Sequence, residues 1–501
     1  MNIIAIDLGT THCKAVIINT SGKVLKTFQL ATKPIQFKPG WNEQDADEIF
    51  SAVLKLLQQS FSFCKEKDIA CVSFSAAMHS LLAVDKSGKP LMNMITWADL
   101  RSAKYARELK SKPVADKIYE TTGVPIHAMS PLCKLIWMKH ESKKIFDKAF
   151  KFISIKEYVF FKLFGKYIVD CSIAAATGLF DEKNICWYNE ALNIAGIMEE
   201  KLSELVGIEH CETELLPAIK TKLKTKNKIP FVLGASDGAL ANMGSGLFNA
   251  KNMAVTIGTS GAARITTNKY VTDKQQRLFC YYIDKEMYIL GGAVNNGGVV
   301  LQWLIEKVLQ QNFKDEKVFK KIFKEATQIK AGAEGLIFLP YLNGERSPMW
   351  DENVRGAFIG LTSSHKQTHV IKAVLEGICF GLLDVIKAVE ESDKSIEKIY
   401  LSGGIIKSPE WVQIFANITG KNIVINDAAD ASALGAAFVG MKAVGVLDSY
   451  TKSDLFLKET ELIKPDKKEH NIYKKYFKVY QSLYKQLKDS FEMINQIDNS
   501  G

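Results

Sequence analysis

"IIAIDLGTTHCKAVII" (residues 3–18) opens the chain as two apolar runs that flank a turn. The pattern predicts a β-hairpin, although hairpin turns usually carry Asn-Gly or Asp-Gly. Here the turn holds Asp7, Gly9, Thr10 and Thr11. A glycine lets the backbone approach an anion closely, and adjacent N–H and hydroxyl groups can donate to phosphate oxygens. We therefore interpret the turn as a phosphate-binding site.

A second copy of the pattern lies in the other half of the chain. "MAVTIGTSGAARIT" (residues 253–266) again predicts a strand, a glycine-threonine turn and a strand. Placing Gly258 on Gly9 brings Thr259 and Ser260 onto the two threonines of the first turn. Two unrelated β-turns are the alternative. The matching pair favours an internal duplication that produces two similar domains.

The two copies differ at the end of the first strand, where Asp7 corresponds to Thr256. A carboxylate repels anions, so Asp7 is poorly suited to bind phosphate directly. It suits a Mg²⁺ ion that lies between the carboxylate and the phosphates, because Mg²⁺ usually keeps several of its waters. Lys14, on the returning strand, can add positive charge. We predict Asp7 as the metal ligand.

At 501 residues the chain is expected to form two or more domains. Three strands, a helix over 45–64 and a strand over 69–78 predict the start of a ribonuclease-H-like unit. Glycine and small residues cluster over 231–252 and predict a domain boundary. The tail over 473–494 predicts an amphipathic helix. The residues expected on its apolar face are Tyr476, Val479, Tyr480, Leu483, Leu487 and Phe491.

A third glycine-rich turn follows a predicted strand at "LSGGIIKSPEWVQIFANITG" (residues 401–420). Gly403 and Gly404 can let a nucleoside lie against the backbone. Ser408 before Pro409 predicts a helix start, with serine as the N-cap and proline at the first helical position. We predict that Gly403, Gly404 and Ser408 contribute to nucleotide binding.

Composition bounds the possible partners. Hydrophobic residues at 47% and charged residues at 24% are typical of a globular protein. The net charge of +10 comes mostly from lysine, and no basic stripe is interleaved with aromatic residues, so neither nucleic acid nor membrane is an expected partner. Nine cysteines without a C-x-x-C pair favour a reducing, cytoplasmic location. Arginine is scarce. The few arginines are therefore expected at sites that need the planar, bidentate hydrogen bonding of a guanidinium group. The arginines are Arg101, Arg107, Arg264, Arg277, Arg346 and Arg355.

The ordered motifs resemble the FGGY carbohydrate kinases of the actin-like ATPase superfamily. They are "IDLGTT" (6–11), "GWNEQDADEIF" (40–50), "TGVPIHAMSPLCKLIW" (122–137), "AAATGLFD" (174–181), "GASDGALANMGSG" (234–246), "TIGTSGAAR" (256–264), the third glycine-rich turn and "ASALGAAFVG" (431–440). The resemblance implies an α/β protein with two ribonuclease-H-like domains around a deep cleft. It implies a sugar-binding domain over 1–243 and a nucleotide-binding domain over 244–501, which ends in the amphipathic helix.

The resemblance also implies a catalytic base, Asp237 in "ASDGA". Phosphoryl transfer needs alignment, charge neutralisation and an acceptor for the hydroxyl proton. Without the family, an aspartate in such a turn is more often a turn former or a helix cap. Met78 and His79 follow a strand, where α/β proteins place ligands, and are expected to contact the sugar.

The motif W-A-D-L-R supplies Trp97, Asp99 and Arg101 as further candidate substrate residues. The tryptophan can wall the sugar and the aspartate can accept hydroxyl hydrogen bonds. The arginine can orient that aspartate or bind an anion.

Within the family, "AMHSLLAVDKSGKPLMNMITWADLRS" (77–102) and "YLNGERSPMWDENVRGAFIGL" (341–361) resemble gluconokinases most and xylulokinases next. Gluconate carries a carboxylate that needs a cationic partner when desolvated. Arg346 is our first candidate for this partner and Arg101 the second. Arg346 can alternatively pair with neighbouring acids, Glu345 or Asp351. Arg264 is expected to be structural.

The expected function is ATP- and Mg²⁺-dependent phosphorylation of a small sugar or sugar acid, D-gluconate to 6-phosphogluconate being favoured. A xylulokinase or another pentulose or polyol kinase is the first alternative. An actin-like nucleotide-dependent scaffold without catalysis is the second. A homodimer is compatible with the sequence.

Overall fold

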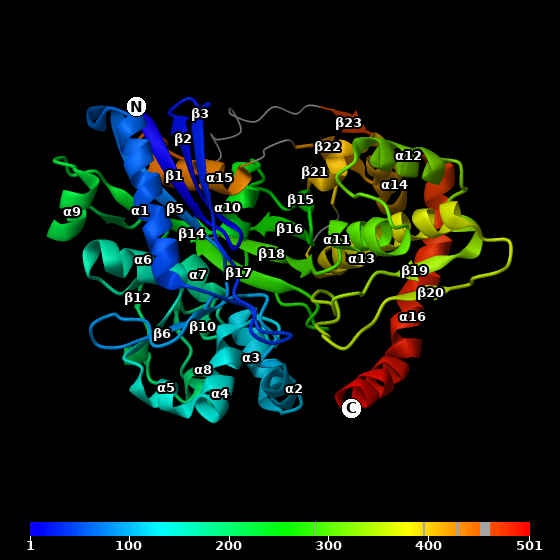
Figure 1. The fold of residues 1–501 in the computed structure, drawn as a ribbon, viewed down its shortest axis with the longest axis horizontal. Coiled ribbons are helices and arrows are strands. Elements are labelled where there is room, and N and C mark those ends of the chain that lie inside the picture. Colours follow the sequence, from blue (N-terminus) through cyan, green and yellow to red (C-terminus); the bar gives the residue numbers. More distant parts are fainter. Residues whose placement is uncertain (286, 394–395, 427–429, 451–460, 501) are drawn as a thin grey trace.

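The structure, a computed structural model, describes residues 1–285, 287–393, 396–426, 430–450 and 461–500. It contains two large mixed β-sheets, one in each half of the chain, with helices packed around them (Figure 1). Nine cysteines lie in the described residues, and all are free thiols.

The first sheet has six strands. In spatial order they are β13 (Cys211–Glu212), β14 (Phe231–Ser236), β5 (Ile69–Ala76), β1 (Asn2–Leu8), β2 (His12–Asn19) and β3 (Val24–Ala31). The opening hairpin is confirmed, since β1 and β2 pair antiparallel with Asp7 opposite Lys14. The predicted helix is α1 (Ala46–Phe63), and it begins where the Asp45 side chain accepts backbone N–H bonds. The strand after it, β5, returns parallel to β1.

The second sheet has seven strands. In spatial order they are β17 (Phe279–Asp284), β18 (Met287–Val294), β16 (Gly261–Thr267), β15 (Asn252–Ile257), β21 (Lys398–Gly403), β22 (Asn422–Ile425) and β23 (Leu462–Ile463). The central pairings repeat those of the first sheet. Asp7 lies opposite Ser75 between parallel strands β1 and β5, and Thr256 lies opposite Ser402 between β15 and β21. The predicted duplication is confirmed as a shared ribonuclease-H-like topology.

Helices surround both sheets. Those of the first half are α2 (Ala103–Lys110), α3 (Val114–Thr122), α4 (Pro131–Glu141), α5 (Lys143–Lys148), α6 (Ile155–Phe164), α7 (Cys171–Ala175), α8 (Asn189–Ala195), α9 (Pro217–Leu223) and α10 (Asp237–Gly244). Those of the second half are α11 (Gly298–Trp303), α12 (Glu316–Thr327), α13 (Gln367–Ser392), α14 (Pro409–Thr419), α15 (Ala431–Ala443) and α16 (Lys467–Ser500). None of these described helices has the length and apolar character that a membrane crossing requires.

The long C-terminal helix α16 packs on the second half, as predicted. Tyr480, Leu483 and Phe491 of the expected apolar face are buried and Tyr476 and Leu487 are partly buried, but Val479 is not part of the buried stripe. Tyr473, Phe477 and Tyr480 are buried, whereas Val479 is 47% exposed. The buried stripe follows the helical steps of four and three residues from Tyr473, and these steps pass over Val479. The Tyr480 hydroxyl also lies 2.8 Å from that of Tyr341, which anchors the helix.

Helix α15 comes from the second half of the sequence but packs on the first sheet. In Figure 1 this orange helix lies beside the blue strands β1 and β2. Its buried alanines, Ala433 and Ala436 among them, belong to the same apolar core as β1 and β5. The division into 1–243 and 244–501 does not anticipate this arrangement.

Helices α10 and α15 cross at a pair of glycines. A Cβ atom on Gly435 would lie 2.0 Å from the Leu240 carbonyl oxygen, and one on Gly244 would lie 1.9 Å from that of Ala431. Both distances are far below van der Waals contact, so the crossing requires glycine at these two positions.

We expect Gly435→Ala to lower the melting temperature by several degrees, because overpacking of this kind costs about 1–3 kcal/mol. The added methyl group meets backbone, which cannot rotate away, and this cost exceeds the gain in helix propensity. Differential scanning calorimetry measures the shift. Gly207→Ala is the control, since a Cβ there meets nothing within 4 Å. Equal melting temperatures for the two variants would contradict the tight crossing.

Candidate active site

A cavity of about 310 Å³ lies between the two halves and is lined by residues of both. We call it the cleft cavity. It brings together nine of the eighteen site residues predicted from the sequence. These are Thr10, Met78, His79, Trp97, Asp237, Gly258, Thr259, Ser260 and Arg346. The lining also includes Arg264, which we had expected to be structural.

Asp237 is the first residue of α10, directly after β14. Its Oδ1 accepts a 2.7 Å hydrogen bond from the backbone N–H of Gly238. Burial and, to a smaller extent, the negative charge of Asp7 together raise the pKa of Asp237 to about 6, although the cations of Arg264 and Lys156 oppose the shift. The carboxylate is therefore ionised at neutral pH but is a stronger base than an exposed aspartate.

A buried ion pair holds the strand end that carries Asp237. Lys156 Nζ lies 2.7 Å from Asp170 Oδ2 and donates to the Ala235 carbonyl at 2.9 Å. The adjacent Ser236 backbone N–H donates to the Ser172 hydroxyl at 3.2 Å. Sequence reasoning missed this support, because the lysine and its partners lie on separate elements.

His79 lies in the cleft cavity with a left-handed backbone, φ 66°. Its Nδ1 lies 2.7 Å from the Ala176 carbonyl, which can only accept, so Nδ1 carries the proton. Burial and the nearby Lys134 cation lower the pKa of His79 to about 3. The ring is therefore neutral, and Nε2 has a lone pair that can accept a hydroxyl hydrogen bond.

Arg346 reaches the cleft cavity from the loop between strands β19 (Ile337–Leu339) and β20 (Ala357–Ile359). Its Nε donates to Asn295 Oδ1 at 2.8 Å, and Nη2 donates to the Val294 carbonyl at 3.2 Å. The guanidinium carbon lies 4.8 Å from the centroid of the Trp97 ring. Burial lowers the pKa of Arg346 to about 10, so the side chain is charged at neutral pH.

The two acids considered as structural partners of Arg346 are otherwise engaged. The Glu345 carboxylate accepts from the backbone N–H groups of Asn295 and Arg346 and from the Asn296 amide. Asp351 accepts from the Tyr484 hydroxyl at 2.9 Å. Among the described residues, no carboxylate forms an ion pair with the Arg346 side chain. Its charge is therefore available to a ligand.

Asp99 and Arg101 do not enter the cleft cavity, so the prediction that they bind substrate is corrected. Arg101 donates to both Asp99 oxygens, at 2.8 and 2.7 Å, and to Glu43 at 2.7 Å. The side chains of Asp99 and Arg101 are 0% and 3% exposed, and the guanidinium stacks on Trp41 at 3.7 Å. Arg101 orients Asp99 and has no free face for an anion.

The second glycine-threonine turn lies where two cavities meet, because Gly258 and Thr259 line both. The turn is held from behind by the start of α11. The backbone N–H groups of Gly298 and Val299 donate to the Gly258 and Thr259 carbonyls at 2.7 and 3.1 Å. A Cβ on Gly298 would lie 2.8 Å from the Gly258 oxygen, so this support requires glycine.

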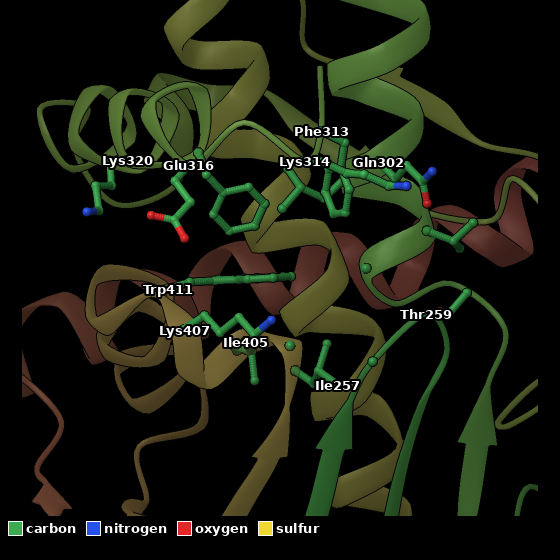
Figure 2. Close-up of a pocket in the computed structure, with 16 residues that line it drawn as sticks. Ile257, Thr259, Gln302, Phe313, Lys314, Glu316, Lys320, Ile405, Lys407 and Trp411 are labelled. Carbon is green, nitrogen blue, oxygen red and sulfur yellow. The ribbon is translucent and has the colours of Figure 1, made fainter. Parts of the chain in front are cut away.

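The second cavity, of about 820 Å³, extends from this turn toward α12 and α14. We call it the outer cavity. Figure 2 shows Trp411 lying flat across it, with Ile405 and Lys407 on the same side and Lys314 and Glu316 opposite. Gly404, which was predicted to contribute to nucleotide binding, lines this cavity. Trp411 is 2% exposed and stacks on Phe323, so only a small part of its ring faces the cavity beside the glycine turn.

Several residues predicted to bind the cofactor have other contacts. Ser408 is buried, caps α14 by accepting from the Trp411 N–H, and donates to Glu410, so its predicted nucleotide contact is corrected. Lys14 pairs with Asp430 at 2.9 Å instead of lining either cavity. Gly9, Thr11 and Gly403 also lie outside both linings. Gly403 instead packs against Ile257 with φ 90°.

Asp7 lies near Asp237, as its effect on the pKa of that carboxyl shows. Its Oδ2 accepts from the Ser432 hydroxyl at 3.2 Å. Its Oδ1 is buried without a hydrogen-bond partner among the described residues, and burial raises the pKa of Asp7. A buried acceptor that lacks a donor fits a cation or its bound water.

Comparison with known proteins identifies the family of this chain. Residues 2–244 match the N-terminal domain of the FGGY family of carbohydrate kinases, and residues 253–444 match its C-terminal domain. The chain belongs to the FGGY family of carbohydrate kinases. Membership of this family favours a catalytic role over a scaffold, and sugar kinases of the family use ATP as the phosphate donor.

Relatives of this kinase are named for different substrates. It is 40% identical over 457 residues to the gluconokinase of Bacillus subtilis (strain 168). The aligned region covers 89% of this chain and 88% of that protein. A crystal structure of gluconate kinase from Lactobacillus acidophilus matches with a TM-score of 0.94 and 34% identity, covering 98% of this chain and 99% of that one. A ligand-bound xylulose kinase structure from the same organism matches with the same TM-score, identity and coverage.

Proposed function

We propose that this kinase transfers a phosphoryl group from ATP to the primary hydroxyl of D-gluconate and releases 6-phosphogluconate. The observation that carries the proposal is Arg346, a buried cation in the cleft cavity without a carboxylate partner among the described residues. A desolvated carboxylate on the acceptor would complete this pair. The similarity to gluconokinases supports the same substrate.

The acceptor and the donor would occupy different cavities that meet at the second glycine-threonine turn. The half over 1–243 supplies Met78, His79 and Trp97 to the acceptor. The half over 244–501 would hold the nucleotide, with the base against Trp411 in the outer cavity. The γ-phosphate would then lie near Thr259, at the entrance to the cleft cavity.

Trp411 provides a test of the nucleotide site. We expect Trp411→Leu to raise the KM for ATP about 5- to 150-fold, since loss of a stacked base costs about 1–3 kcal/mol. Steady-state kinetics with varied ATP measure the change. Trp187→Leu is a matched control, because that buried indole in the first half also donates to a backbone carbonyl. A Trp411 variant with the KM of this control would place the base elsewhere.

Asp7 would hold Mg²⁺ beside the donor phosphates, through its buried Oδ1. When bound, the ion would neutralise phosphate charge during transfer. Asp7 also places a negative charge near Asp237, which strengthens the base.

The chemistry of the acceptor falls to Asp237. Its carboxylate would accept the proton of the primary hydroxyl as the oxygen attacks the γ-phosphate. His79 Nε2 would accept a hydrogen bond from another hydroxyl of gluconate and so fix the orientation of the substrate. Closure of the two halves would exclude water and suppress ATP hydrolysis.

A panel of acceptors tests the proposal. ADP release is measured with gluconate, xylulose, ribulose, glycerol and fuculose under identical conditions. We expect the highest kcat/KM for gluconate. Xylulose as the best acceptor would replace gluconokinase by the xylulokinase alternative, which the ligand-bound relative keeps open.

A further inference from the structure

Arg264 lies on β16 with its side chain in the cleft cavity. Its Nε is buried without a hydrogen-bond partner, and no carboxylate among the described residues forms an ion pair with it. A guanidinium has five N–H donors, and burying charged donors unpaired is costly unless a ligand satisfies them. A purely structural arginine would have its partners within the protein, as Arg101 has.

Two glycines lie close to this side chain. A Cβ atom on Gly238 would lie 3.5 Å from Arg264 Nε, and one on Gly291 would lie 3.1 Å from Arg264 Cγ. Gly238 is the residue directly after Asp237, so the guanidinium lies over the first turn of α10. Arg264 is therefore beside the proposed base and faces the same cavity.

The two arginines of the cleft cavity have different neighbours, although the charge of Arg264 also acts on Arg346. Arg346 stacks on Trp97, and its charge also lowers the pKa of His79, which places it among the sugar-contacting residues. Arg264 adjoins Asp237. Asp237 is the only acid among the described lining residues, so the two arginines leave the cavity with net positive charge. Such a cavity is suited to two oxyanions.

We propose that Arg264 is a catalytic residue that binds the oxyanion of the phosphoryl group during its transfer, while Arg346 binds the carboxylate of the acceptor. This inference rests on the proposed function. In the step, the bond between the γ-phosphorus and the ADP oxygen breaks and the bond to the acceptor oxygen forms. The hydroxyl proton passes to Asp237, ADP leaves with the electron pair, and Arg264 stays protonated and donates to the equatorial oxygens.

The test separates this role from that of Arg346. We expect Arg264→Met to lower kcat for gluconate about 10³- to 10⁵-fold. The dissociation constant of gluconate, measured by calorimetry without nucleotide, should change less than about threefold. Arg264→Lys should recover part of the loss in kcat, since it restores the charge but not the fork. Arg277→Met is the control, because Arg277 is paired with Asp273 and Glu391 away from the cavity.

The pH dependence gives a second readout that a structural role would not produce. Arg264 lowers the pKa of Asp237, as Lys156 does, whereas Asp7 raises it; Arg346 also interacts with this carboxyl. Removing Arg264 should therefore move the acidic limb of kcat/KM to higher pH. Arg264→Met should lose more activity near pH 6 than near pH 8, and Arg277→Met should lose the same fraction at both.

Three results would overturn the proposal. One is a large rise in the gluconate dissociation constant with kcat retained, which would assign Arg264 to the acceptor carboxylate. Another is an unchanged kcat and acidic limb in Arg264→Met. The third applies if Arg264→Met does not fold. In that case Arg264→Lys would have the same kcat and the same acidic limb as the wild type. Failure of the proposed function would be recognised in the wild-type protein, which would then prefer an acceptor other than gluconate. The kcat and pH measurements on the Arg264 variants would be made with that acceptor.

Discussion

Asp237→Asn should reduce kcat by about 10²- to 10⁴-fold, the range expected when a positioned general base is removed. Asparagine keeps the size of the side chain but cannot take the hydroxyl proton. The affinity for ATP should stay within about twofold, since Asp237 lines the cleft cavity and not the outer cavity. Single-turnover phosphorylation and nucleotide titration measure the two quantities.

The wild-type protein offers a pH test of the same assignment. The pKa of Asp237 is raised to about 6, so the carboxylate is ionised above that pH and protonated below it. We therefore expect kcat/KM to fall as the pH drops through about 6. Asp45→Asn is the control for Asp237→Asn. Asp45 also lies at a helix start, and asparagine caps a helix well, so this variant should keep full activity. An Asp237→Asn variant that retained a tenth of the turnover would remove Asp237 from the role of base.

Arg346→Met should raise the KM for gluconate 30-fold or more. Truncating one member of a buried charge pair costs about 2–5 kcal/mol, and methionine preserves the apolar contact with Trp97. The KM for ATP should be unaffected. Initial rates with each substrate varied in turn measure both constants.

Arg107→Met is the control for Arg346, because Arg107 is half exposed and pairs with Glu352. An unchanged KM for gluconate in Arg346→Met would show that the acceptor carboxylate lies elsewhere or that the natural acceptor has none. An equal rise in both KM values would instead indicate a general loss of structure.

The parts of the fold that were predicted correctly from the sequence are those that depend on local residue patterns. The hairpin, the helix capped by Asp45 and the helix start at Ser408 depend on residues a few positions apart. The duplication was visible because glycine and hydroxyl residues recur at the same place in two hairpins. Asp237 was identified by its family motif, and the structure places it in the cleft cavity.

Several of the errors concern charged residues whose partners are remote in the sequence. Arg101 is neutralised in part by Glu43, and Lys14 pairs with Asp430. No local pattern shows such pairs, so the sequence could not tell which cations remain open to a ligand. Arg264 was missed for the same reason, although the scarcity of arginine had placed it among the six to consider.

The position of α15 has a consequence for how the protein is made. Strands β1, β5 and β14 emerge early from the ribosome, but the helix that covers them lies at residues 431–443. The first sheet therefore cannot complete its core until most of the second half has been synthesised. A fragment ending at residue 244 would expose that apolar face, and adding a peptide of residues 431–443 should restore its solubility.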